Sequence, residues 1–124
     1  MTKESHLIFD PATLPASLEI DDSEILQEFY AEFLSQLEEL KRALARSASA
    51  AANRSELSGT AHKLKSSSQA IGAWQLSNYL KMLEQAAINN TPELQAIFST
   101  TQLLIEPTRM AIREEITRLS KGVR

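Results

Sequence analysis

His62 is the residue of this 124-residue chain whose type and setting best suit nucleophilic chemistry. One ring nitrogen of an imidazole can attack an electrophile while a hydrogen bond holds the other nitrogen. On a helix, the neighbours of His62 at three and four positions are Ser58, Gly59, Lys65 and Ser66. Three of these residues are small and one is a cation. We therefore expect an accessible histidine that a large partner can reach.

A carboxylate, that of Glu84, is predicted to return to the height of His62 on the next helix. Gly72 should end the first helix about 15 Å beyond His62, and the chain then descends about 18 Å to Glu84. A carboxylate there can accept a hydrogen bond from Nδ1–H, which leaves Nε2 free to attack. Lys65 supplies a cation for an anionic electrophile such as a phosphoryl group. Lys63, about 100° round the helix, adds only long-range attraction.

The helix that carries His62 must bury its opposite face. The histidine lies two residues before Leu64, about 200° round a helix that turns about 100° per residue. The imidazole should therefore point to solvent. The stripe expected to be buried comprises Leu57, Ala61, Leu64, Ser68 and Ile71.

Three further long amphipathic helices are predicted. Asp21, Asp22 and Ser23 offer caps for the first, and Asn53 offers a cap for the helix of His62. The first stripe runs Leu26, Phe29 or Tyr30, Phe33, Leu37, Leu40 and Leu44; the next helix has Leu76, Leu80, Leu83 and Ala87. The last has Leu94, Phe98, Thr101, Ile105, Thr108, Ile112 and Leu119.

Prolines mark where two helices begin and where one bends. Asp10 and Pro11 are expected to start a short N-terminal helix as N-cap and first residue, with Pro15 breaking or offsetting it. Thr91, Pro92 and Glu93 are expected to start the last helix in the same way. The apolar phase of that helix continues through Pro107, which predicts one kinked helix.

These elements predict an all-α fold: an antiparallel up-down four-helix bundle with a short additional N-terminal helix. Residues 11–122 are expected to form a single domain. Residues 1–10 are expected to be a linker or tail, which docks through Leu7, Ile8 and Phe9 and carries a solvated His6.

Composition excludes several function classes. There is no cysteine, which favours a reducing, cytoplasmic setting and excludes thiolate metal sites. The net charge is −3 with no basic block, so we expect no nucleic-acid partner. No apolar run could span a bilayer, so we expect no direct membrane contact. We also expect no metal and no cofactor, because His62 lacks a second ligand at metal spacing and no nucleotide motif is present.

One stretch of the sequence resembles the signature of histidine-containing phosphotransfer (HPt) domains of bacterial multistep His–Asp phosphorelays. It comprises Ala61-His62-Lys63-Leu64-Lys65-Ser66-Ser67-Ser68, Ile71-Gly72-Ala73, Leu76, Leu83 and Glu84. Ser66 departs from the pattern, which usually has glycine there. The resemblance implies that His62 is the phosphoacceptor, that Lys65 positions or neutralises the phosphoryl group, and that Glu84 orients the imidazole.

The predicted function is that of a phosphoryl carrier, not an enzyme with its own turnover. It would accept a phosphoryl group from the aspartate of a response-regulator receiver domain and pass it to a second receiver. We expect a monomer, either standing alone or excised from a hybrid sensor kinase that is bound to a membrane. The surface expected to meet the receiver comprises Ser58, Gly59, Lys63, Ser66 and Gln69.

Two other functions are alternatives to the carrier. A helical adaptor could bind receivers through the same surface without phosphotransfer. The phosphoacceptor helix of a sensor kinase resembles His followed by Glu and later Pro, whereas here Lys63 follows His62 and no proline occurs before Pro92.

Overall fold

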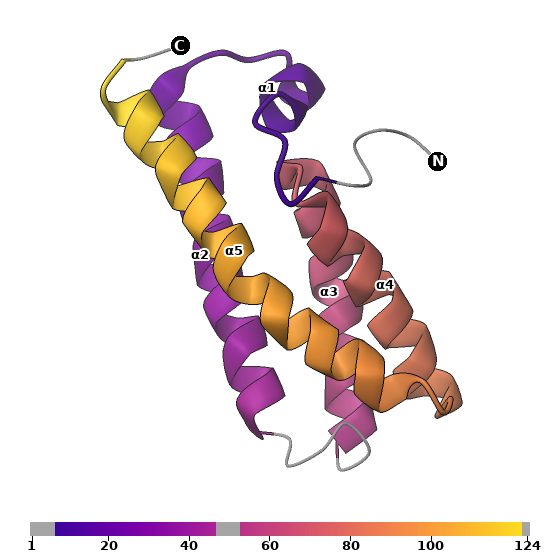
Figure 1. Ribbon diagram of the computed structural model, residues 1–124. Coiled ribbons are helices and arrows are strands. Elements are labelled where there is room, and N and C mark those ends of the chain that lie inside the picture. The colour runs from indigo at the N-terminus through magenta and orange to yellow at the C-terminus, as the bar shows by residue number, and fades with distance from the viewer. Residues whose placement is uncertain (1–6, 47–52, 123–124) are drawn as a thin grey trace.

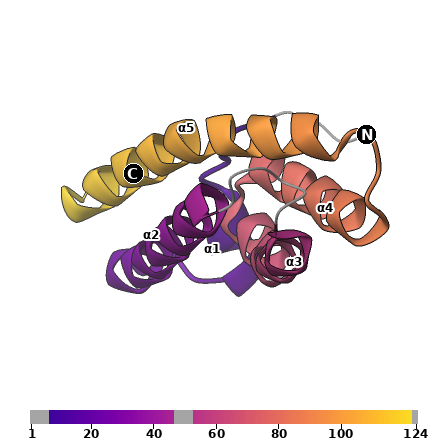
Figure 2. The same cartoon turned by 90° about the horizontal axis from the view of Figure 1, so that it is seen from below.

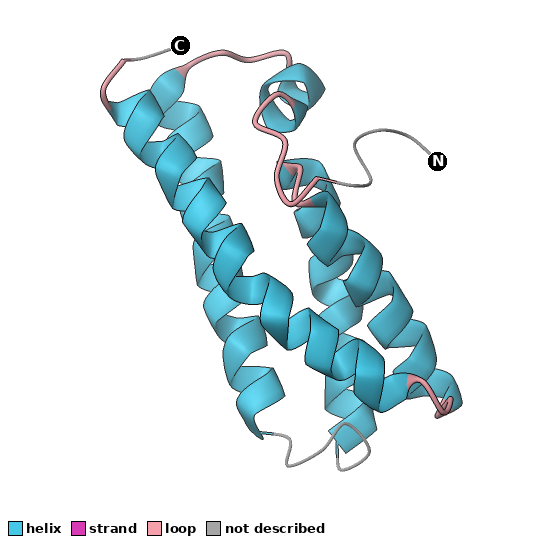
Figure 3. Ribbon diagram, viewed as in Figure 1, coloured by secondary structure: helices cyan, strands magenta, loops and turns pink. Residues whose placement is uncertain are grey.

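The computed structural model describes residues 7–46 and 53–122, and its regular elements there are all helices. The expectation for His6 lies outside these residues. The predicted all-α class is confirmed, and Figure 3 shows the helices joined by loops. The helices are α1 (Thr13–Leu18), α2 (Ser23–Arg46), α3 (Arg54–Ile71), α4 (Trp74–Asn89) and α5 (Leu94–Ser120).

The four long helices alternate in direction and form a ring, as the sequence predicts. α2 packs against α3 and α5, and α4 packs against the same two helices. Figure 2 shows this ring nearly end-on, with α5 lying across α2 and α4. α1 is the additional short helix and lies near the end of the bundle where α3 turns into α4 (Figure 1).

The predicted apolar stripes form the core. Every stripe residue expected on α3, α4 and α5 is buried. On α2 the choice between two aromatic residues is resolved: Tyr30 is fully buried, whereas Phe29 is 46% exposed. Polar residues on the stripes are tolerated because they bond to their own helix: the hydroxyls of Ser68, Thr101 and Thr108 donate to the carbonyl oxygens four residues earlier.

Gly72 ends α3 in the predicted left-handed conformation, with φ of 97°. Its carbonyl accepts a hydrogen bond from Asp10 N at 2.9 Å, so the N-terminal segment crosses the turn closely. A Cβ on Gly72 would lie 2.5 Å from Asp10 O. Phe9, in the same segment, packs edge-on against Tyr30 with ring centroids 5.7 Å apart. This glycine therefore joins the helix turn to the N-terminal segment.

The two helix starts expected at prolines are displaced. α1 begins at Thr13, after a turn in which the carboxylate of Asp10 accepts from Ala12 N at 3.0 Å. Pro15 therefore falls in the first turn of α1, where proline is tolerated, and it does not break the helix. α5 likewise begins at Leu94, whose N–H donates to the carbonyl of Thr91. In both places a backbone turn precedes the helix.

The predicted side-chain cap is present at the start of α2 and absent at the start of α3. Asp22 caps α2 as predicted, because its carboxylate accepts from the N–H groups of Glu24 and Ile25. Asn53 occupies the N-cap position of α3 but makes no capping bond. Its amide instead donates to the carboxylate of Glu56 at 2.9 Å.

α5 runs unbroken through Pro107, as predicted. Figures 1 and 2 both show it bending near its middle. Proline removes the hydrogen bond to the carbonyl four residues earlier, that of Leu103. Both residues are exposed, so water can reach that carbonyl. Across residues 7–46 and 53–122, no helix has the length and apolar character that crossing a bilayer requires.

Candidate functional site

His62 stands on the outer face of α3, where the periodicity of the sequence places it. Its side chain is 68% exposed, while Ala61 and Leu64 beside it are buried in the core. The prediction that the imidazole points to solvent is therefore confirmed.

Glu84 reaches His62 from α4. Its Oε2 lies 2.6 Å from Nδ1 of His62, and its side chain is only 9% exposed. The predicted contact between the two side chains is present because the rise of α3 to Gly72 nearly equals the descent of α4 to Glu84.

Lys65 binds the second oxygen of the same carboxylate. Its Nζ lies 2.6 Å from Oε1 of Glu84, and its side chain is 30% exposed. The sequence suggested Lys65 as a cation directed at a phosphoryl group, and it gave no sign of this ion pair. Glu84 therefore bridges two residues of α3 that lie almost one turn apart.

These contacts determine which ring nitrogen of His62 carries the proton. The hydrogen bond from Lys65 lowers the pKa of Glu84, burial opposes the shift, and the hydrogen bond from His62 adds to it. An ionised carboxylate can only accept hydrogen bonds, so Nδ1 of His62 carries the proton in this contact. In a neutral ring, Nε2 is then left with its lone pair.

The five residues expected to meet a partner surround His62 on α3. Gly59, Lys63, Ser66 and Gln69 are exposed, and Ser58 is half-buried. Nζ of Lys63 lies 3.2 Å from a carboxylate oxygen of Glu39 on α2, so this lysine forms an ion pair with a neighbouring helix at the surface of the protein.

An apolar hollow of about 310 Å³ adjoins this face on the side of α1 and α2. Its lining includes Leu18 of α1, Phe29 of α2, and Ser67 and Ala70 of α3. The sequence did not identify these apolar residues. One feature of the sequence could have indicated an apolar surface here: Phe29 and Tyr30 are adjacent, and only one of two adjacent aromatic side chains can point into the core.

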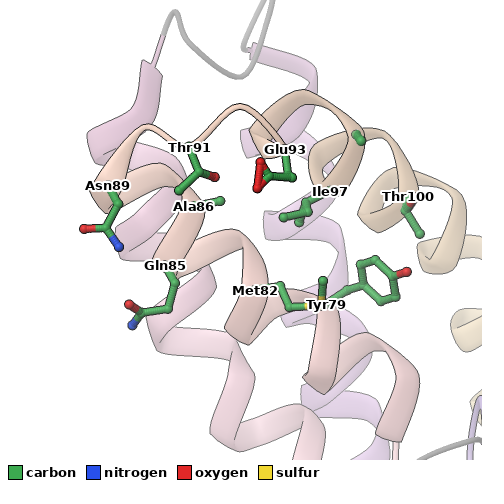
Figure 4. A pocket seen from close by; sticks show the side chains of 10 residues that line it. Tyr79, Met82, Gln85, Ala86, Asn89, Thr91, Glu93, Ile97 and Thr100 are labelled. Carbon is green, nitrogen blue, oxygen red and sulfur yellow. The ribbon is translucent and has the colours of Figure 1, made fainter.

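A larger hollow, of about 500 Å³, lies between α4 and α5, and none of His62, Lys65 and Glu84 lines it. Figure 4 shows Tyr79 and Met82 of α4 facing Ile97 and Thr100 of α5 across it. This hollow is therefore separate from the His62 site. Among the residues that the structure describes, no cluster of three histidine, aspartate or glutamate residues could hold a metal ion.

Comparison with known proteins identifies the family. No curated protein and no solved structure matches the sequence significantly. The family model of the Hpt domain, in contrast, matches residues 24–122, which include all four long helices except the first residue of α2, together with the site. The chain therefore belongs to the Hpt domain family, whose members are histidine-containing phosphotransfer modules.

Proposed function

We propose that this protein carries phosphoryl groups between two receiver domains, with His62 as the phosphoacceptor. The observation that carries the proposal is the contact of Nδ1 with Glu84, which leaves Nε2 as the free nitrogen of a 68% exposed ring. Family membership supports phosphotransfer and an interaction with receiver domains. Relay from one receiver to a second, in that direction, is our inference.

The proposed step is an in-line transfer. The lone pair of Nε2 attacks the phosphorus of an aspartyl phosphate, and the bond from phosphorus to the aspartate oxygen breaks, so the carboxylate leaves with the electron pair. The product is a phosphoramidate on a ring that has become positively charged. Glu84 stabilises this charge through Nδ1–H. A second receiver aspartate reverses the reaction and takes the group onward.

Lys65 is proposed to act first through Glu84. Its ammonium keeps the carboxylate ionised and holds it beside Nδ1. The Lys65 side chain is also 30% exposed, so we expect its ammonium to add positive charge near the incoming phosphoryl group as well. Positioning and charge neutralisation supply most of the catalysis in such transfers.

The proposed docking face combines small polar residues with an apolar rim. Ser58, Gly59, Ser66 and Gln69 leave room around the imidazole, and Lys63 lies at the edge. Leu18, Phe29 and Ala70 contribute the apolar part, which adjoins the same face of α3. Protein interfaces typically bury apolar side chains and leave polar residues at the rim, so these apolar side chains should be buried when a partner docks. The family usually has glycine at the position of Ser66. The serine side chain is small, so it restricts the approach of a receiver domain to His62 only slightly.

Several expectations stay predictions. These are the domain limits at residues 11–122 with a linker or tail at 1–10, the monomeric state, the cytoplasmic location, and the origin of the chain in a hybrid kinase. Contacts of the N-terminal segment support its docking onto the bundle: the N–H of Gln75 donates to the carbonyl of Leu7 at 3.0 Å.

The proposal is tested by incubating the protein with a receiver domain that has been phosphorylated by acetyl phosphate. We expect an acid-labile, alkali-stable label on the wild type and none on His62→Gln, which should fold normally because the ring is exposed. Binding of the receiver without any label, under conditions where an established carrier is labelled, would favour the adaptor function instead.

A further inference from the structure

A polar hollow of about 440 Å³ lies between α3 and α4 beside the His62 site. Lys65 belongs to both places, because its ammonium binds Glu84 while its side chain lines the hollow. Ser66 and Gln69 also line it, and they lie one and two turns beyond His62 on the same face of α3. A protein that covers His62 and these two residues therefore covers the hollow as well.

The lining of this hollow contains two lysines and no carboxylate. The charge of Lys65 is offset by Glu84. Lys81, on α4, is exposed, and it forms no ion pair with any residue of the two described stretches. Lys81 is therefore available in this hollow to pair with an anionic group of another molecule.

Trp74 lines the same hollow and carries a hydrogen-bond donor that has no partner among the described residues. Its indole Nε1–H is buried, and the part of the chain that the structure describes offers it no acceptor. Because indole is a donor only, it can be satisfied only by an acceptor such as a carboxylate oxygen or water.

The two hollows on the other side of α3 have a different character. The polar one is lined by Glu39 and Glu56 together with cations that pair with them, including Lys63 and Arg46. The apolar one includes Glu32. An anionic group brought to the His62 face would therefore find its favourable site on the α4 side.

We propose that this hollow receives an acidic side chain, Asp or Glu, of the receiver domain that docks over His62, and that Lys81 is the residue that pairs with it. The inference rests on the proposed function. A protein-borne carboxylate suits the position because Ser66 and Gln69 place the hollow inside the footprint of a domain that covers His62. A charge pair at this place would speed association and help to select the receiver.

The test compares Lys81→Glu with Lys41→Glu, which makes the same charge change on α2, at the side facing α5. Transfer from a phosphorylated receiver that loads the wild type is measured against receiver concentration. For Lys81→Glu we expect the half-saturating concentration to rise about tenfold while the rate at saturation changes by less than about twofold. Lys41→Glu should match the wild type. A receiver variant with one acidic residue changed to lysine should restore the affinity of Lys81→Glu.

The single tryptophan provides a second measurement. In the 15N-labelled protein, the one indole N–H signal should shift when unlabelled receiver binds to the wild type, and it should shift less in Lys81→Glu at equal occupancy. Equal behaviour of the two lysine variants overturns the inference. A shift caused by inorganic phosphate but not by the receiver also overturns it, since the hollow would then take a free anion. A wild type that accepts no phosphoryl group from any receiver contradicts the proposed function itself.

Discussion

The carboxylate of Glu84 lies 2.6 Å from Nδ1 of His62, so a nearly buried anion on α4 holds an exposed ring on α3. Lys65 occupies the other oxygen of that carboxylate. Lys65, Glu84 and His62 are joined by charge-assisted hydrogen bonds. The nearly buried Glu84 is held between the other two, and Nε2 of the exposed His62 is left free to react. The proposed carrier function depends on this order.

Glu84→Ala should slow phosphoryl transfer to His62 without abolishing it, by about 10²-fold. The substitution removes the anion that balances the charge on the phosphorylated ring and frees Nδ1 from its partner. Single-turnover transfer from a phosphorylated receiver measures the effect. Glu114→Ala, on the exposed face of α5, is the control. A transfer rate for Glu84→Ala equal to that of the control would remove Glu84 from the mechanism.

Acid should destabilise the wild type more than Glu84→Gln. The pKa of Glu84 is lowered in the folded protein, chiefly by the hydrogen bond from Lys65, whereas the unfolded chain has the ordinary value of 4.5. The unfolded state therefore binds the proton first, and the stabilisation is lost as the pH falls from about 4.5 through the folded-state pKa. Urea denaturation at neutral and acidic pH measures this slope. Equal slopes for the two proteins would contradict the prediction.

Gly72→Ala should cost more stability than Gly122→Ala. Both glycines have positive φ, at 97° and 70°, and an L-residue in that region costs about 1–2 kcal/mol. At Gly72 the new Cβ also meets Asp10 O at 2.5 Å, whereas at Gly122 nothing lies within 4 Å. Thermal unfolding of the two variants gives the comparison. An equal loss would mean that the N-terminal segment does not hold the α3–α4 turn closely.

Tyr30→Phe should leave stability at neutral pH unchanged or raise it, because the hydroxyl of Tyr30 is buried with no partner among the described residues. Burial, followed by the charge of Glu115, raises the pKa of Tyr30 to about 12. The folded state therefore keeps a proton that the unfolded state loses near pH 10, so the wild type should lose stability between about pH 10 and 12. Denaturation at neutral and alkaline pH tests both parts. Tyr79→Phe should keep the alkaline loss, and a Tyr30→Phe protein that also keeps it would contradict the account.

The helices and the central contact could be predicted from the sequence because both follow from fixed geometry. A period of 3.6 residues places Leu64 inside and His62 outside, and a rise of 1.5 Å per residue brings Glu84 back to the height of His62. The left-handed turn at Gly72 follows from the freedom that glycine has at positive φ. These features depend only on the spacing and the types of residues along the chain.

The features that the sequence missed depend on how side chains share their partners. Lys65 can bond to Glu84 because the carboxylate has two oxygens and His62 contacts only one of them. Asn53 bonded to Glu56 in place of the backbone, and both proline turns delayed their helices. The hollows beside α3 arise from the packing of neighbouring helices, which no periodicity reveals.

The central claim is that Glu84 holds Nδ1 so that Nε2 of His62 takes the phosphoryl group. Phosphorus and nitrogen NMR of the 15N-labelled, receiver-phosphorylated protein can assign the bonded ring nitrogen directly. The account predicts one phosphohistidine, at His62, with phosphorus on Nε2 and the proton kept on Nδ1. Phosphorus on Nδ1, or on any other residue, would contradict it.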